Sequence, residues 1–205
     1  MPDAVTSFFL VMAKDPSREW AVMSNNDDLH VDKPNSKNDN KRLQSYISYS
    51  VLAGISGFDL KHVLVQHGLW AESHEIVEEG SFLLTLPLAL NQRWHADFSY
   101  RLSLFLGDST SVPLSVIVAL DDTHIRVSPG AIKGAMLSPE YLPDPTYLPL
   151  SRGDVIVFRG DLIHSGAFSL GNSESVRLHL VVHMPSQGMG FDPVHTHRPP
   201  YGPSV

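Results

Sequence analysis

The sequence predicts a mainly β fold, an antiparallel jelly roll with helices at its N-terminal end. Two observations carry this prediction. From residue 81 onward, short runs rich in β-branched and aromatic residues, such as 114–120, are separated by Gly, Pro and Asp. Before residue 81, apolar residues recur at helical spacing instead, and the only long interruption, 24–42, is polar and rich in Asn and Asp.

The composition fits one globular domain of ordinary size. The chain has 205 residues, of which 42% are hydrophobic and 18% are charged, which is enough to bury a substantial core. We divide this single domain, 1–205, into three parts: an N-terminal helical and loop region packed on the barrel (1–80), a β core (81–184) and an irregular C-terminal tail (185–205).

Charge and cysteine content exclude several classes of function. The net charge of −7 with His neutral argues against a nucleic-acid partner. The absence of Cys excludes disulfides, thiolate metal sites and a Cys nucleophile, so a metal must be bound by His, Asp, Glu or backbone oxygen. The apolar run 8–13 is too short to span a membrane, and Asp3 stands where a signal peptide carries positive charge. We therefore expect a cytoplasmic protein without a membrane segment.

Local patterns predict the elements of the N-terminal region in order. The apolar run 8–13 is expected to form a strand or a helix, and 24–42 a mobile loop. Apolar residues at helical spacing predict a helix over 43–53. Asp59 is placed to cap a second short helix, and 73–79 is expected to form one more helical turn.

The β core is predicted as seven strands and a proline-rich loop. The strands are expected at 82–86, 100–106, 114–120, 124–128, 155–158, 162–168 and 176–184. The loop is expected between the fourth and fifth of these strands, because it contains Pro139, Pro143, Pro145 and Pro149.

The last predicted strand has two faces of different character. One face carries only apolar residues, namely Val176, Leu178, Leu180 and Val182. The other carries Arg177, His179, Val181 and His183. Because a buried Arg needs an anion, we interpret the second face as the lining of a ligand site inside the barrel. The alternative is that this face meets solvent.

Four residues from three separate parts of the sequence suggest a metal site with a neighbouring ligand. His95 and Asp97 lie two positions apart and so point to the same side of a strand, and His164 can complete a three-point face around a metal. Two imidazoles and one carboxylate suit non-haem Fe(II) and its oxygen chemistry. Arg177 supplies a planar charged fork for a carboxylate ligand. His179 either hydrogen-bonds that ligand, supports the metal ligands from behind, or is a packed neutral histidine.

These residues resemble a known family in their order and spacing. The motifs that carry the resemblance are, in order, His95-Ala96-Asp97, Gly153-Asp154 ahead of His164, and Arg177. Through them the chain resembles the Fe(II)/2-oxoglutarate-dependent dioxygenases, and within them the phytanoyl-CoA dioxygenase-like branch. The resemblance covers roughly residues 81–184. One departure is Ala131-Ile132 after Pro129-Gly130, where members often have Ser-His, which leaves the substrate class open.

The resemblance implies a fold, cofactors and a reaction. The fold is a double-stranded β-helix in which His95, Asp97 and His164 bind Fe(II) and Arg177 pairs with the distal carboxylate of 2-oxoglutarate. The reaction is hydroxylation or oxidative demethylation of a small-molecule or peptide substrate by O2, with succinate and CO2 as co-products and ascorbate as a candidate reductant. The substrate and the oligomeric state are not set by the sequence.

Two other functions remain open at this point. A cupin-like metal enzyme uses more ligands, so a residue such as His179 or a Glu would have to join His95 and His164. A binding or scaffold module would keep the barrel without 2-oxoglutarate chemistry.

Overall fold

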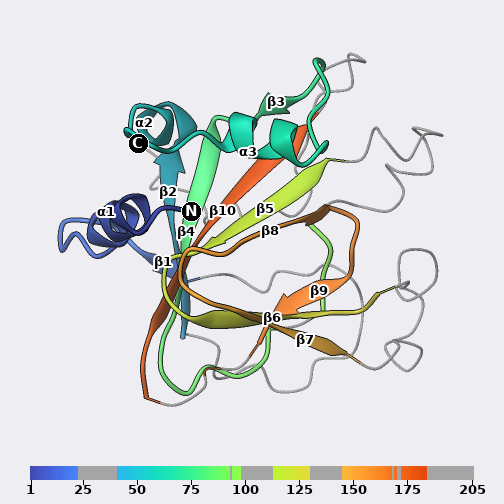
Figure 1. Ribbon diagram of the computed structural model, residues 1–205. Coiled ribbons are helices and arrows are strands. Elements are labelled where there is room, and N and C mark those ends of the chain that lie inside the picture. The colour runs from blue at the N-terminus through green and yellow to red at the C-terminus, as the bar shows by residue number, and fades with distance from the viewer. Residues whose placement is uncertain are drawn as a thin grey trace, which may run out of the picture.

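The structure, a computed structural model, describes residues 1–22, 41–92, 94–97, 113–129, 145–167, 169 and 172–183. Within these residues the chain forms three helices and two antiparallel sheets that lie one against the other (Figure 1). The helices are α1 (Asp3–Ala13), α2 (Tyr49–Ala53) and α3 (Leu60–Gln66). The strands are β1 (Ala21–Val22), β2 (Arg42–Ser48), β3 (Glu75–Ile76), β4 (Glu79–Thr85), β5 (Leu114–Ala119), β6 (Thr123–Val127), β7 (Thr146–Leu150), β8 (Val155–Arg159), β9 (His164–Gly166) and β10 (Ser175–His183).

The two sheets differ in size and in how the chain visits them. The large sheet has the order β1-β2-β4-β10-β5-β8, with β3 paired to one end of β10, and the small sheet has the order β7-β6-β9. Strands distant in sequence are therefore neighbours, because β10 lies between β4 and β5. The chain crosses repeatedly between the sheets, as expected for a jelly roll.

The outer face of the large sheet is apolar and is covered by the helices. The predicted apolar face of β10 lies here, and each of its four residues is at most 1% exposed. It packs in one core with Phe9 of α1, Leu52 of α2 and Leu64 of α3, which are all fully buried. Burying a side chain of this kind contributes about 1.5–3 kcal/mol, so this core fixes the large sheet in place.

The inner face of the large sheet meets the small sheet. Ile117 and Ala119 of β5 pack there against Ile125 and Val127 of β6. The polar face of β10 also points into this space, and Arg177 is only 5% exposed. The alternative that this face meets solvent is therefore wrong for Arg177.

The prediction of a helix over 43–53 is wrong in its first half. Residues 42–48 form β2, which pairs with β4 over seven consecutive positions from Arg42↔Thr85 to Ser48↔Glu79. This long-range pairing outweighs the local helical pattern, since propensity is a weak constraint against tertiary structure. Only Tyr49–Ala53 is helical.

Two other N-terminal predictions have opposite outcomes. The Asp59 cap is confirmed, because its side chain accepts a hydrogen bond of 2.8 Å from the backbone N–H of His62 at the start of α3. The helical turn over 73–79 is wrong, because β3 pairs with the end of β10 and Glu79 begins β4.

The proline-rich loop was also predicted too long. Residues Thr146–Leu150 form β7, although this segment contains Pro149. The strand lies at the end of the small sheet and pairs with β6, where Pro149 is opposite His124. A proline is tolerated at such an edge because its missing N–H faces away from the neighbouring strand.

The remaining predictions divide by whether the structure describes them. The predicted strands near 82–86, 114–120, 124–128, 155–158, 162–168 and 176–184 correspond to β4, β5, β6, β8, β9 and β10, and the run 8–13 lies in α1. The predicted strand 100–106, the tail 185–205 and most of the polar stretch 24–42 lie outside the described residues.

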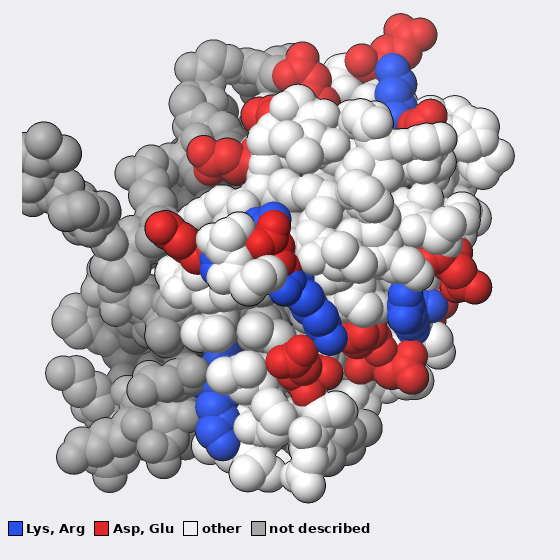
Figure 2. Space-filling model, turned by 90° about the vertical axis from the view of Figure 1, so that its left-hand side faces the viewer, with Lys and Arg blue, Asp and Glu red and all other residues white. Residues whose placement is uncertain are grey.

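The face that carries α1 has no concentration of positive charge. Figure 2 shows acidic and basic side chains interspersed there among the coloured residues, and Lys14 pairs with Glu174 at 3.1 Å. None of the helices in the described ranges is both long and apolar enough to span a membrane.

Candidate metal centre

Backbone hydrogen bonds hold His95 and His164 side by side. The His95 N–H donates to the His164 carbonyl at 3.0 Å, and the His164 N–H donates to the His95 carbonyl at 2.8 Å. Residues paired in this antiparallel way point to the same face, and the two ring centroids are 4.5 Å apart. The bridge therefore fixes two imidazoles from distant parts of the chain at one place on the small sheet.

The His164 ring is oriented by its surroundings. Its Nδ1 lies 3.0 Å from the carbonyl oxygen of Leu162, and its ring meets Phe158 edge-on at 4.8 Å between centroids. With the proton on Nδ1 donated to this carbonyl, Nε2 carries the lone pair that a metal needs. His164 is buried, so few other orientations are open to it.

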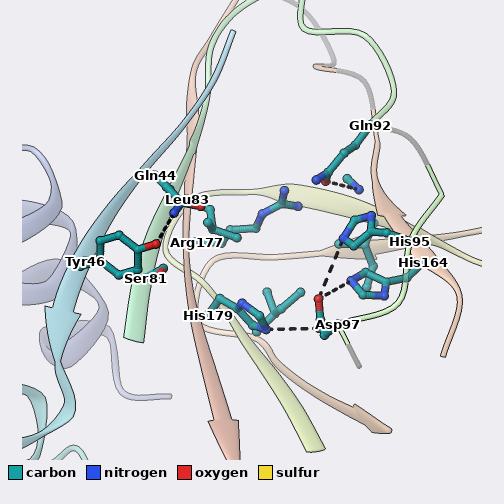
Figure 3. A pocket seen from close by; sticks show the side chains of 13 residues that line it. Gln44, Tyr46, Ser81, Leu83, Gln92, His95, Asp97, His164, Arg177 and His179 are labelled. Carbon is teal, nitrogen blue, oxygen red and sulfur yellow. Dashed lines mark hydrogen bonds and ion pairs between the residues drawn. The ribbon is translucent and has the colours of Figure 1, made fainter. Parts of the chain in front are cut away.

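Asp97 supplies the third ligand atom (Figure 3). Its Oδ1 lies 3.6 Å from His164 Nε2 and 4.0 Å from His95 Nε2. One ligand atom from each residue lies within 4.8 Å of the others. Two atoms bound to one ion at about 2.1 Å can be at most about 4.2 Å apart. The two Asp97 distances lie within this limit, and the widest separation, up to 4.8 Å, would have to shorten when an ion binds. The structure brings together all three residues that the sequence suggested.

The charge state of Asp97 suits this role. Burial alone raises the pKa of its carboxyl group, but the neighbouring His164, His179 and His95 outweigh burial and hold the pKa well below its ordinary value. The side chain is therefore an ionised carboxylate although it is only 6% exposed. An ionised carboxylate is the form that binds a metal cation.

The second carboxylate oxygen of Asp97 faces different residues. Ser115 of β5 donates a hydrogen bond of 2.5 Å to Oδ2. His179 of β10 places Nε2 at 3.4 Å from the same oxygen. His179 thus lies in the site, but it is not one of the three residues whose ligand atoms cluster together.

Arg177 lies in the same cavity, and no ion pair or hydrogen bond to it is found among the described residues. Its Nε is buried and has no hydrogen-bond partner among the described residues. Burial and the positive charge of Arg42 lower the pKa of Arg177 to about 9, against the opposing influence of Asp97. A buried cation of this kind calls for an anionic ligand.

Arg42 of β2 lies beside Arg177 and ties the two sheets together. It is 1% exposed and donates to Thr85 Oγ1 at 3.1 Å, to the Leu90 carbonyl at 2.8 Å and to the Ala167 carbonyl at 2.7 Å. Both guanidinium groups lie close to Gly166. A Cβ at that position would lie 2.6 Å from Arg42 Nη1 and 2.8 Å from Arg177 Nη2, so any other residue there would force these groups to shift.

The cavity that contains these groups is small, with a volume of about 50 Å³. It lies between the sheets, and its far wall is formed by β2 and β4 (Figure 3). In that wall Gln44 donates a hydrogen bond of 2.8 Å to the hydroxyl of Tyr46. The lining residues are Gln44, Tyr46, Ser81, Leu83, Gln92, His95, Asp97, Ile117, Ile125, His164, Gly166, Arg177 and His179.

Arg126 of β6 fastens the segment that carries His95. Its Nη2 donates to the Gln92 carbonyl at 2.8 Å, and its Nε donates to Ser165 Oγ at 2.9 Å. Its guanidinium also lies 4.4 Å from the centre of the Trp94 ring. One buried side chain thus connects the neighbours of His95 to the neighbour of His164.

The sequence interpretation missed Arg42, Ser115 and Arg126. For two of them the sequence held a signal. Ser115 interrupts the apolar strand 114–120, and Arg126 stands in a short strand between Ile125 and Val127. A polar residue at such a position needs a buried partner. Arg42 gave no such signal, because its role depends on a strand pairing that the local pattern concealed.

Comparisons with known proteins bear on the fold of the chain. No protein-family model matches the chain, and no curated protein matches its sequence. The fold, in contrast, matches many solved structures.

Three of these structures illustrate the match. HygX from Streptomyces hygroscopicus, solved with nickel and 2-oxoglutarate bound, is 10% identical, with a TM-score of 0.59 over 91% of this chain and 80% of that chain. SnoN, a non-haem α-ketoglutarate-dependent epimerase from nogalamycin biosynthesis, is 16% identical, with a TM-score of 0.53 over 98% and 88%. An oxidoreductase of the 2OG-Fe(II) oxygenase family from Burkholderia pseudomallei is 12% identical, with a TM-score of 0.53 over 88% and 77%.

The chain therefore has the fold of 2-oxoglutarate-dependent non-haem iron enzymes. At these identities the similarity establishes the fold. Within that fold, this chain carries its own His-Asp-His cluster between the two sheets. The phytanoyl-CoA dioxygenase-like branch stays a prediction.

Proposed function

We propose that the protein is an Fe(II)- and 2-oxoglutarate-dependent oxygenase. The observation that carries this proposal is the buried guanidinium of Arg177, without an ion pair or hydrogen bond among the described residues, in the same cavity as His95, Asp97 and His164. A metal site alone fits many functions. A metal site beside a buried cation fits a ligand that binds a metal at one end and presents a carboxylate at the other, as 2-oxoglutarate does.

In this proposal, His95, Asp97 and His164 hold the metal from one side and leave the side facing the cavity open. Fe(II) bound there with 2-oxoglutarate would supply O2 activation, with succinate and CO2 as co-products and oxidation of a substrate C–H bond. The chain's own contribution is to fix the ligand atoms and to exclude water. The burial of Asp97 and His164 supports that contribution.

The charge of Arg177 supports a co-substrate that carries a carboxylate. Arg177 is buried in the cavity lining, and Asp97, the acidic residue of that lining, lies with the two histidines of the metal cluster. A carboxylate of 2-oxoglutarate bound next to Arg177 would compensate its positive charge. The distal carboxylate can accept two parallel hydrogen bonds from the planar fork of Arg177.

We propose a small molecule as the substrate and hydroxylation or oxidative demethylation as the outcome. A second structure of HygX, with a TM-score of 0.57, contains nickel, 2-oxoglutarate and hygromycin B, which supports a small-molecule site in this fold. Proteins of the same fold include an epimerase and a carbocyclase. The assay should therefore measure succinate, which does not depend on the product.

The test combines binding and turnover. Under anaerobic conditions, addition of Fe(II) and 2-oxoglutarate should produce a visible metal-to-ligand charge-transfer band, and admission of O2 should then give slow, uncoupled formation of succinate. His95→Ala and Asp97→Ala should abolish both signals. His183→Ala is the matched control, because His183 lies on β10 but does not line the cavity. Succinate formation that survives His95→Ala would contradict the proposal.

The cupin-like alternative has less support in the geometry. It would need a residue such as His179 to join the metal ligands, but His179 Nε2 faces Asp97 Oδ2, away from the oxygen that the other histidines share. Binding of metal without any response to 2-oxoglutarate would favour that alternative.

A further inference from the structure

We propose that His179 and Ser115 are positioning residues that restrict Asp97 to binding a metal through one oxygen. This inference rests on the proposed metal site. It gives His179 a role different from contact with the co-substrate, and it adds Ser115, which the sequence interpretation did not include.

The two oxygens of Asp97 have separate neighbours. Oδ1 is the oxygen nearest to Nε2 of both His95 and His164, at 4.0 and 3.6 Å. Oδ2 accepts the Ser115 hydroxyl at 2.5 Å and lies 3.4 Å from His179 Nε2. His179 Nε2 is buried and has no hydrogen-bond partner among the described residues, so its 3.4 Å approach to this carboxylate is a contact between an imidazole and an anion. The carboxylate is therefore divided between a metal-facing oxygen and a protein-facing oxygen.

This division follows from the fold. The two candidate histidine ligands meet at the edge of the small sheet, at the bridge between His95 and His164. Ser115 and His179 belong to β5 and β10 of the large sheet. The register pairs Ser115 with Val181 and His179 with Ile117, so Ser115 and His179 are diagonal neighbours on the inner face. Asp97 thus spans the gap between the sheets.

The neighbours of Oδ2 change what Asp97 can do for a metal. The Ser115 hydroxyl donates a hydrogen bond to this oxygen, and the His179 imidazole lies 3.4 Å from it, so the protein occupies the space around Oδ2. An oxygen engaged in this way is a poor second ligand. Asp97 then takes one metal position, and the position that a bidentate carboxylate would fill stays open for a ligand in the cavity.

The test measures metal binding to the full chain without any turnover. Ni(II) and Co(II) are titrated by calorimetry into wild type, Ser115→Ala, His179→Leu and His179→Gln. Partners behind a ligand typically change metal affinity by about 10–100-fold. We expect losses in that range for Ser115→Ala and His179→Leu. His179→Gln keeps an N–H donor near the position of Nε2 and should stay within about threefold of wild type, well below that range.

A matched control separates positioning from general damage to the strand. His183→Leu makes the same change four residues along β10, at a residue outside the cavity lining. It should leave the affinity for Ni(II) unchanged. Thermal unfolding of each metal-free variant checks that it is folded. Ser115→Ala removes a single hydroxyl, so it decides the outcome if His179→Leu does not fold.

The visible d–d absorption of the Co(II) form gives a readout that a purely structural role would not move, because it reports coordination number and geometry. We expect Ser115→Ala and His179→Leu to alter the shape and intensity of these bands, as a second Asp97 oxygen joins the metal. His179→Gln should restore the wild-type spectrum. Weaker binding with unchanged bands would overturn the inference.

The experiment distinguishes failure of this inference from failure of the proposed metal site. If wild type binds neither Ni(II) nor Co(II), the metal site itself is wrong, and this inference falls with it. If wild type binds both metals and the Ser115 and His179 variants bind them equally well with the same spectra, the metal site stands and the positioning role is wrong.

Discussion

Replacing Arg177 with Met should stabilise the metal-free protein while removing its affinity for 2-oxoglutarate. Arg177 is 5% exposed, its Nε has no partner among the described residues, and Arg42 adds a second positive charge nearby. The buried positive charge therefore destabilises the folded protein as long as no anionic ligand is bound next to it. Met fills much of the same volume without a charge.

The pKa of Arg177 sets the size of the effect. Lowering the pKa of this guanidinium from its ordinary value to about 9 corresponds to roughly 5 kcal/mol against the charged form, as an upper limit. Replacing buried ionic groups with apolar ones usually gains about 1–4 kcal/mol. We expect a gain of about 2 kcal/mol for Arg177→Met, because some packing and solvation are lost. For a chain of this length that gain raises Tm by about 4–8 °C.

The pH dependence has a defined sign. Below about pH 9 Arg177 is protonated in both the folded and the unfolded state, so the cost of its charge is constant. Above about pH 9 the folded state loses a proton that the unfolded state, with its higher pKa, still binds. Wild-type stability therefore rises with pH relative to the variant in this range. The advantage of Arg177→Met should therefore shrink above pH 9.

Arg126→Met is the matched control, because the same substitution should have the opposite effect. Arg126 is also buried, but it donates to Gln92 and Ser165 and stacks on Trp94. Its loss removes the donors to the Gln92 carbonyl and the Ser165 hydroxyl, so it should lower the free energy of unfolding by about 2–4 kcal/mol. Thermal unfolding and calorimetric titration with 2-oxoglutarate measure both variants. A lower Tm for Arg177→Met in the absence of ligand would refute the argument that its buried charge destabilises the folded protein.

The other predictions concern backbone space, helix capping and the outer core. Gly166→Ala places a Cβ 2.6 Å from Arg42 Nη1 and 2.8 Å from Arg177 Nη2, so it should lower the free energy of unfolding by about 1–3 kcal/mol. It should also weaken binding of 2-oxoglutarate more than binding of Ni(II), and equal losses of affinity for both ligands would contradict this. Asp59→Ala removes the N-cap of α3 and should lower stability by about 1 kcal/mol, with succinate formation unchanged. Leu64→Ala, at a fully buried position, should cost about 2–5 kcal/mol in chemical denaturation, and a loss below 1 kcal/mol would show that α3 is not part of the core.

Periodicity and spacing predicted the parts of the fold that local sequence determines. The alternation of residues along β10 distinguished an apolar face from a face with Arg177 and His179. The two faces differ because one packs against the helices and the other lines the cavity. The spacing of His95 and Asp97 placed two side chains on one side of the chain. The meeting with His164 was expected from the order of the motifs, and the structure provides its cause in the backbone bridge.

Long-range pairing determines what the sequence did not predict. Residues 42–48 have apolar residues at helical spacing, yet they form a strand because β4 supplies partners over their whole length. Because residues 43–48 were predicted as part of a helical region, the sequence interpretation did not place Arg42 in the barrel, where it is buried as the first residue of β2. Ser115 and His179 both lie on the inner face, but their convergence on one oxygen depends on the distance between the sheets, which no local pattern encodes.

Calorimetric titration of 2-oxoglutarate under anaerobic conditions, with and without Fe(II), tests the account most directly. We predict saturable binding that requires iron and that is lost in His95→Ala, Asp97→Ala and Arg177→Met, with His183→Ala unchanged. Absence of binding in the presence of iron, or binding of equal strength without it, would contradict a site built from a metal triad and a buried arginine.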